Sequence, residues 1–182
     1  FLGEHGWFDK RFIYGESFQM PFLIRYPAEI TAGSVNTDMI SNVDFAATFL
    51  DWAELPVPNY MQGRSFRPNC RGETPSDWTD CAYHRYWMNQ DGIHNAYAHY
   101  GIRTHRYKLI YWYNEDLEEE GATPAGDPAR EWELFDLEAD PLELRNVHDD
   151  PQYAEAVRSM RARLDAEMLR IGDVPCHEPL TV

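Results

Sequence analysis

The sequence predicts an α/β fold: the end of a mostly parallel α/β sheet layer, followed by a smaller α+β subdomain with an antiparallel sheet and one long helix. The first observation is a short apolar run at 20–27, bounded by prolines and followed by a helical pattern at 41–55. The second is a series of aromatic, β-prone segments between 80 and 137, separated by turn residues. The third is a single apolar stripe at helical spacing that begins after Asp150–Pro151.

The first predicted layer contains one strand, one helix and a long loop. The run MPFLIRYP at 20–27 is typical of a buried strand, because both of its faces are apolar. Ser41 or Asn42 is suited to cap the helix at 41–55. Residues 56–78 are rich in Pro and Gly and predict a surface loop.

The predicted subdomain begins with strands at 80–89 and 96–114, the second range being two strands about a turn near Thr104–His105. A further strand is expected at 132–137, after an acidic loop at 115–131. Asp150–Pro151 is a helix start, and Gly172 is a helix end. The apolar positions between them repeat every three or four residues: Tyr153, Val157, Met160, Leu164, Met168 and Ile171.

Composition limits the classes of partner. The chain has 182 residues, 43% of them hydrophobic, with 16 Lys and Arg against 31 Asp and Glu, a net charge of −15. A field of this sign repels polyanions, so nucleic acid is excluded as a general partner, although a locally basic pocket can bind a single anion. No apolar run approaches the roughly 18 residues of a membrane span, so no membrane partner is expected. The compartment stays open, as does the choice between a Cys70–Cys81 disulfide and free thiols.

Three stretches, in this order, resemble the C-terminal half of the type I sulfatases, in the alkaline-phosphatase-like superfamily. They are LGEHGWFDKRFIYGES followed by PFLIRYP; VDFAATFLDWAELPVPNYMQGRSF; and HYGIRTHRYKLIYWY followed by WELFDLEADPLELRNVHDDP. Ala47 stands where the family usually has Pro. The resemblance covers roughly residues 1–172. It implies that 1–77 is the C-terminal part of a sulfatase catalytic α/β domain and that 78–182 is the C-terminal α+β subdomain.

The resemblance also implies what the chain lacks. In the family a formylglycine nucleophile is made from the Cys or Ser of a Cys/Ser-x-Pro-x-Arg motif, and this motif does not occur here. The family's Ca²⁺ is held by Asp, Asn and His residues that precede the position of Phe1. We therefore expect a fragment that is inactive alone, with nucleophile and metal ligands upstream in a missing N-terminal half, which is its natural partner.

Four residues are candidates for the site. The resemblance gives Lys10 the role of binding the sulfate oxygens, where a compact positive charge stabilises developing negative charge. His5 is expected either to contact the leaving-group oxygen or to fix the shape of its loop. His99 and Arg103 lie four residues apart on a predicted strand and share a face, which suits binding of an anionic sugar. Glu16 is expected to pair with Lys10 or Arg11.

The predicted function is hydrolysis of a sulfate ester on a small molecule or carbohydrate. A phosphodiesterase or phosphonate monoester hydrolase of the same superfamily is the first alternative, since the loop around Lys10 is shared between these classes. A non-catalytic module that binds carbohydrate or a protein partner is the second. Structural roles are expected for His84, Arg85, His94 and His105.

Overall fold

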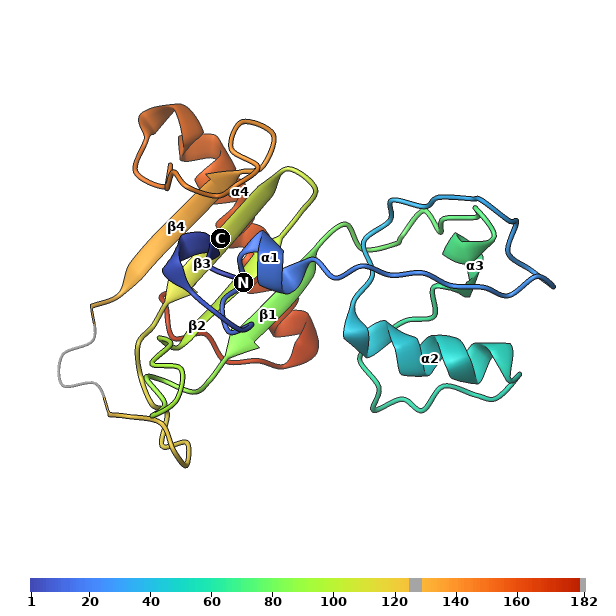
Figure 1. Ribbon diagram of the computed structural model, residues 1–182, viewed down its shortest axis with the longest axis horizontal. Helices are drawn as coiled ribbons and strands as arrows, with labels where there is room; N and C mark the ends of the chain where they lie inside the picture. Colours follow the sequence, from blue (N-terminus) through green and yellow to red (C-terminus); the bar gives the residue numbers. More distant parts are fainter. Residues whose placement is uncertain (125–128, 181–182) are drawn as a thin grey trace. The chain divides into compact units, whose positions relative to one another are not determined.

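The computed structural model describes residues 1–124 and 129–180, which form two compact units. Unit 1 consists of Phe1–Met20 and Tyr83–Val182, and unit 2 of Pro21–Ala82 (Figure 1). The N-terminal segment thus belongs to the same compact unit as the C-terminal sheet, although 62 residues of chain separate the two parts. The division at residue 77 into a catalytic-domain part and a subdomain stays a prediction. Residues 125–128 of the expected acidic loop and the last two residues of the tail lie outside the described residues.

The predicted antiparallel sheet and long helix are confirmed in unit 1. The sheet order is β1-β2-β3-β4, with bounds Ala82–Tyr86, His99–Arg103, Tyr107–Trp112 and Glu131–Asp136. Strand β2 pairs antiparallel with β3 in the register Gly101↔Ile110, and β3 pairs antiparallel with β4 in the register Ile110↔Glu133. Helix α4, Ala154–Ile171, follows the 3-10 turn η2, Pro151–Tyr153.

Both faces of this sheet are covered. Helix α4 packs across β2 and β3 through Met160, Leu164 and Met168, as the apolar stripe predicts. The opposite face carries the N-terminal segment, which holds the 3-10 turn η1, Glu4–Gly6, and the short helix α1, Gly15–Phe18 (Figure 1). Ile13 of this segment is fully buried against Ile110 and Phe135. Burying one such side chain contributes roughly 1.5–3 kcal/mol, which helps to hold the N-terminal segment on the sheet.

Gly101 permits this close packing. A Cβ atom at this position would overlap the carbonyl oxygen of Leu109 and would lie 3.2 Å from Cδ1 of Ile13. The Gly in HYGIRT is therefore required for close approach of the N-terminal segment to the sheet.

Unit 2 is organised around α2, Asn42–Trp52, and the single turn α3, Arg67–Cys70. The Asp44 carboxylate accepts hydrogen bonds from the backbone N–H of Ser41 and of Arg64, both at 2.8 Å. Thr48 Oγ1 accepts from the Phe66 N–H at 3.0 Å. The VDFAATF helix and the GRSF loop are thus joined by side chains that cap backbone groups, which explains why the two motifs occur together.

The strand predicted at 20–27 is absent: no described strand includes these residues. Leu23 is 97% exposed, and Phe22 and Tyr26 are also exposed. An apolar segment of this kind becomes a buried strand only when neighbouring strands supply hydrogen bonds and cover both faces, and no described strand does so here. The three cysteines are all free thiols.

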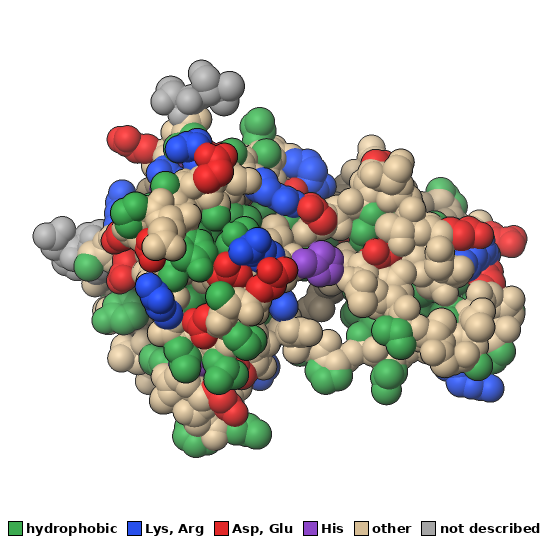
Figure 2. Space-filling view, turned by 90° about the horizontal axis from the view of Figure 1, so that it is seen from above, with side chains coloured by type: hydrophobic (Ala, Val, Ile, Leu, Met, Phe, Trp, Pro, Cys, Tyr) green, Lys and Arg blue, Asp and Glu red, His purple; other side chains and the backbone are tan. Residues whose placement is uncertain are grey.

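No helix among residues 1–124 and 129–180 has the length and apolar character needed to cross a bilayer. On the face seen in Figure 2, acidic and basic side chains are interleaved. The large negative net charge is therefore not gathered there in a single patch.

Candidate functional site

The loop that carries Lys10 is a small hairpin built on glycines. Leu2 and Phe8 form an antiparallel bridge, and the Gly3 N–H donates to the Trp7 carbonyl at 2.9 Å. Gly3 and Gly6 have φ values of 129° and 75°. These conformations are open to glycine but costly for other residues, which accounts for the two glycines of LGEHG.

Asp9 has a φ of 77° and connects the hairpin to Lys10. Lys10 is 70% exposed in its side chain, and its Nζ donates to Asp9 Oδ1 at 2.8 Å. Oδ2 of Asp9 lies 3.3 Å from Nη2 of Arg11. The hydrogen bond from Lys10, followed by the charge of Arg11, lowers the pKa of Asp9. The accessible cation is thus tethered by a carboxylate that stays ionised at neutral pH.

The expected pairing of Glu16 with Lys10 or Arg11 is wrong. Asp9 is adjacent in the chain, and its left-handed backbone brings its carboxylate between the two cations. Glu16 instead lies 3.7 Å from Nε2 of His5.

His5 lies in an aromatic cluster rather than beside Lys10. Its ring stacks on Tyr14 with centroids 4.3 Å apart and planes 7° from parallel. The hydroxyl of Tyr14 donates to Glu133 Oε2 on β4 at 3.0 Å. The described contacts of His5 therefore favour its loop-shaping role, while its contact with a leaving group stays a prediction.

His99 and Arg103 both extend from the face of β2 that the N-terminal segment covers. His99 is fully buried, 4.5 Å from the Trp112 ring and 5.8 Å from the Phe12 ring between centroids, and its Nδ1 bonds the Tyr97 carbonyl at 2.8 Å. Burial lowers the pKa of His99 to about 3, so the ring is neutral at pH 7. Nη2 of Arg103 donates to Gln19 at 3.1 Å. Their role in substrate binding stays a prediction.

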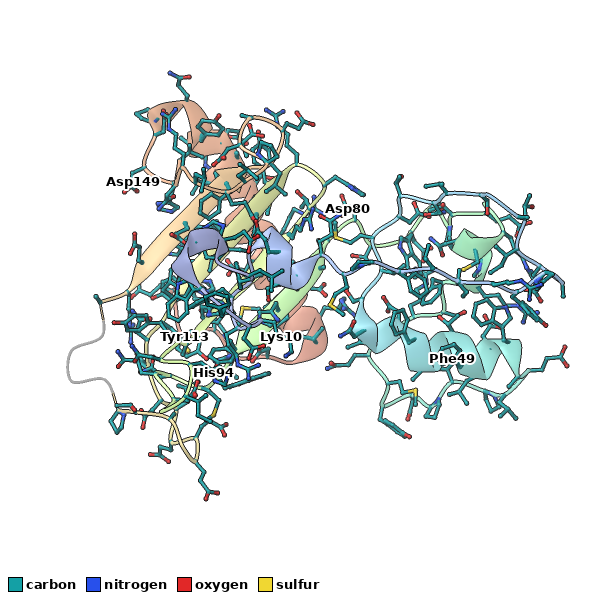
Figure 3. The ribbon with its side chains drawn as sticks, in the orientation of Figure 1. Lys10, Phe49, Asp80, His94, Tyr113 and Asp149 are labelled. Carbon is teal, nitrogen blue, oxygen red and sulfur yellow. The ribbon has the colours of Figure 1, made fainter. Side chains whose placement is uncertain are left out.

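The structure brings one further histidine to the Lys10 loop. His94, in the connection between β1 and β2, places Nε2 3.2 Å from Asp9 Oδ2 and 2.8 Å from Arg11 Nη2 (Figure 3). Its Nδ1 lies 2.9 Å from Asp91 Oδ1. Sequence reasoning missed this placement. The only local signal is the Asp-Gly turn at residues 91–92, in which Asp91 Oδ1 accepts the backbone N–H groups of Ile93 and His94 at 3.0 Å.

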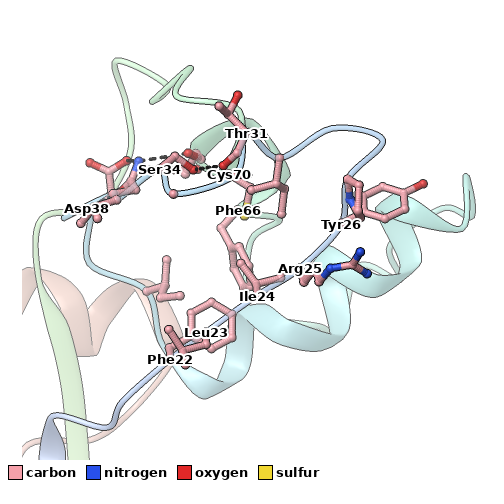
Figure 4. Close-up of a pocket in the computed structure, with 18 residues that line it drawn as sticks. Phe22, Leu23, Ile24, Arg25, Tyr26, Thr31, Ser34, Asp38, Phe66 and Cys70 are labelled. Carbon is pink, nitrogen blue, oxygen red and sulfur yellow. Dashed lines mark hydrogen bonds between the residues drawn. The ribbon is translucent and has the colours of Figure 1, made fainter.

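Two further observations concern a metal site and a cavity. Among residues 1–124 and 129–180, no three His, Cys, Asp or Glu side chains are grouped so that they could hold a metal ion. The described residues therefore contain no set of ligands that fits the calcium ion implied by the family. A cavity of about 660 Å³ lies in unit 2, lined by residues 22–27, by the loop at 30–40 and by Phe66 and Cys70 (Figure 4). Lys10 does not line it.

The fold and the Lys10 loop define a sulfatase C-terminal region, and comparison with known proteins agrees. Residues 3–170 match the family described as "N-sulphoglucosamine sulphohydrolase, C-terminal", and the chain belongs to this family.

An N-acetylglucosamine-6-O-sulfatase of Bacteroides thetaiotaomicron is 42% identical over 184 residues, covering 100% of this chain and 30% of the relative. An arylsulfatase of Clostridium perfringens is 28% identical, covering 92% of this chain and 31% of the relative. The chain thus spans about a third of the length of these curated relatives.

Solved structures show the same similarity. BT4656 in complex with its substrate D-glucosamine-2-N,6-O-disulfate superposes with a TM-score of 0.85 at 41% identity, over 98% of this chain and 33% of that one. A phosphonate monoester hydrolase from Silicibacter pomeroyi superposes with a TM-score of 0.72 at 26% identity, over 93% of this chain and 32% of that one. The N-acetylglucosamine-6-O-sulfatase and BT4656 are thus more similar to this chain than the phosphonate monoester hydrolase is.

Proposed function

We propose that this chain is the C-terminal part of a sulfatase that releases sulfate from the 6-oxygen of a glucosamine-type sugar. The observation that carries the proposal is Lys10, an exposed cation held by Asp9 on a glycine-shaped hairpin, in a chain of the sulfatase family. The sugar is suggested by two relatives, an N-acetylglucosamine-6-O-sulfatase and a protein solved with a 6-O-sulfated glucosamine.

Lys10 would act on the non-bridging oxygens of the sulfate group. Negative charge develops on the ester and its leaving oxygen as the S–O bond breaks. A fixed ammonium group therefore stabilises the transition state more than the ground state. The described residues do not fit a metal site, so we propose that the calcium ion and the formylglycine nucleophile expected for the family are supplied outside this chain.

The test is sulfate release by the full-length protein from 6-O-sulfo-N-acetylglucosamine, with and without Lys10→Ala. We expect the variant to lose about 100- to 1,000-fold in kcat/KM, as when one oxyanion-stabilising donor is removed. Arg25→Ala is the control, because Arg25 is an exposed cation of unit 2 rather than of the Lys10 hairpin. Unchanged turnover in the Lys10 variant would remove this residue from the mechanism.

Two further experiments test the two alternative functions. A phenyl phosphonate and a phosphate diester, offered to the same preparation, test the phosphonate hydrolase alternative, which predicts faster turnover of these than of the sulfate ester. Calorimetry of residues 1–182 with the sulfated sugar tests the binding-module alternative. We expect these residues alone to show no sulfatase turnover with or without calcium.

A further inference from the structure

The connection between β1 and β2 reaches the Lys10 hairpin through a chain of polar contacts. His94 Nε2 lies within 3.2 Å of Asp9, and the other oxygen of Asp9 holds Lys10 Nζ at 2.8 Å. Figure 3 labels Lys10 and His94, which lie near each other although Arg11, the neighbour of Lys10, is 83 positions from His94 in the chain. Two distant segments therefore meet at the cation proposed to bind sulfate.

Each ring nitrogen of His94 has a defined partner. The Asp91 carboxylate already accepts two backbone N–H groups and the Tyr86 hydroxyl, the last at 2.9 Å, and it remains an acceptor. These hydrogen bonds outweigh the effect of burial and lower the pKa of Asp91. An ionised acceptor at Nδ1 requires that this nitrogen carry a proton. Nε2 of the neutral ring is then free to accept from Arg11 at 2.8 Å.

The backbone that carries His94 is tied down at both ends. Asn89 is fully buried, and its side chain accepts from the Ala98 N–H at 3.1 Å and donates to the Thr123 carbonyl at 2.9 Å. The Gln90 N–H donates to the Ala96 carbonyl at 2.7 Å. These hydrogen bonds close the loop and hold the backbone of His94 in place.

From this geometry we propose that His94 is a positioning residue for Lys10, acting through Arg11 and Asp9; the proposal rests on the proposed sulfatase function. A lysine side chain has about 2 kcal/mol of rotamer entropy, and an exposed lysine samples many positions unless its partner is fixed. Asp9 is that partner. His94 fixes the guanidinium of Arg11, and Arg11 in turn fixes the orientation of the Asp9 carboxylate, which leaves Lys10 in one place.

Protonation of His94 would change this arrangement. The groups that face its ring are Asp91, Asp9 and Arg11, with Tyr86 behind Asp91 and Lys10 behind Asp9. A protonated Nε2 can no longer accept from Arg11 and donates to Asp9 instead. Asp9 would then bind three cations, and its hold on Lys10 would weaken. The position of Lys10 therefore depends on an acceptor at Nε2 of His94.

Two amide substitutions separate the functions of the two ring nitrogens. In the full-length protein, His94→Asn places an amide near the Nδ1 position and keeps the Asp91 contact, whereas His94→Gln reaches the Nε2 position and keeps an acceptor for Arg11. We expect His94→Asn to lower kcat by about 10- to 100-fold with little change in KM, as for a misplaced reacting group. His94→Gln should recover most of this loss. His105→Asn is the control, because His105 is exposed in the turn between β2 and β3.

Two results would overturn the proposal: wild-type kcat in His94→Asn, or equal losses in the Asn and Gln variants. Failure of the proposed function would look different, because the wild-type protein itself would release no sulfate. In that case the nitrogen-15 NMR signal of Lys10 Nζ still tests whether His94 positions Lys10. Positioning predicts a sharp signal in the wild type and in His94→Gln and a broadened one in His94→Asn, and identical signals in all three would contradict it.

Discussion

Lys108 on β3 and Glu143 in the turn after β4 form an ion pair that is sealed from solvent, with side-chain exposures of 0% and 2%. The second carboxylate oxygen of Glu143 accepts the Gly15 N–H at the start of α1, at 2.5 Å. Burial lowers the pKa of Lys108 to about 8, against the opposing effect of Glu143. One carboxylate thus joins the sheet, the turn at 140–143 and the N-terminal segment that carries Lys10. This linkage explains why RYK, DPLE and YGES occur together in the chain.

Glu143→Gln should destabilise unit 1 by about 3–5 kcal/mol, the usual cost of leaving one member of a buried ion pair without its partner. The glutamine retains a carbonyl oxygen for Gly15, so the loss comes from the unpaired ammonium of Lys108. Hydrogen exchange of the β3 amides measures the effect within this unit. Adding Lys108→Met to the variant should restore part of the protection.

Glu138→Gln is the matched control. Glu138 lies 3.4 Å from Arg106 but is 70% exposed, and a surface pair of this kind contributes about 0–1 kcal/mol. Equal protection losses in the Glu138 and Glu143 variants would show that the buried pair has no special role.

Gly101→Ala should separate the N-terminal segment from the sheet. The added methyl group would overlap the Leu109 carbonyl and press on Ile13, and overpacking of this kind typically costs 1–3 kcal/mol. In the full-length protein we expect a lower unfolding midpoint and a lower sulfatase turnover, because Ile13 lies three residues from Lys10. Gly92→Ala, which meets no atom within 4 Å, is the control for the unfolding midpoint. A Gly101 variant as stable as the Gly92 variant would contradict the close packing.

The elements of unit 1 could be predicted from the sequence because their signals are local. The strand at 107–112 is rich in β-prone aromatic residues, and the helix at 154–171 has an apolar periodicity that one face of the structure satisfies. The prediction of a strand at 20–27 was wrong. The apolar pattern indicates only that the segment can be buried, and its actual burial depends on neighbouring strands. Local patterns do not contain that information.

The site was predictable only in part for the same reason. Lys10 was found through a motif that surrounds it in the sequence. His94 was missed because its partners Asp9 and Arg11 lie more than 80 residues away in the chain, and local patterns do not show that the two segments meet. His99 was correctly placed on a strand, yet its complete burial depends on Phe12, in a segment whose packing on the sheet has no local signal.

Tyr100→Phe should loosen the C-terminal tail. The Tyr100 hydroxyl accepts the N–H groups of Cys176 and His177 at 2.9 and 3.1 Å. It lies 2.5 Å from His177 Nδ1, and His177 Nε2 lies 2.7 Å from Asp165 on α4. Removing the hydroxyl leaves these buried groups unsatisfied, at a cost of about 1–3 kcal/mol.

Faster hydrogen exchange of the Cys176 and His177 amides is the expected result of this substitution. Tyr97→Phe is the control, because Tyr97 is 44% exposed. Amides of the tail that exchange at wild-type rates in Tyr100→Phe would show that this hydroxyl does not hold the tail.

The stability of unit 1 should fall between pH 6.5 and pH 5 because of two buried histidines. Burial lowers the pKa of His84 to about 4 and that of His99 to about 3, and their rings lie 5.8 Å apart. The unfolded chain takes up protons at these residues near pH 6.5, whereas the folded chain does not until the pH is far lower. The unfolded state therefore binds more protons in this window, and its free energy falls relative to the folded state as the pH falls. Each histidine contributes up to about 1.4 kcal/mol per pH unit below 6.5.

Carboxylates whose pKa is lowered by folding act in the same direction, but only below their unfolded values near 4. Above pH 5, His177, whose pKa is also lowered by burial, adds to the effect of His84 and His99, whereas Glu133, whose pKa is raised by burial, opposes it. Protection factors of the Ile102 and Ile110 amides, corrected for intrinsic exchange, measure the loss. His99→Phe should make the protection less dependent on pH, since its ring suits the contacts with Phe12 and Trp112, although the bond to the Tyr97 carbonyl is lost. The exposed His105, replaced by Asn, should leave the pH dependence unchanged. A His99→Phe protein with the wild-type slope would mean that His99 takes up its proton in the folded state as readily as in the unfolded chain.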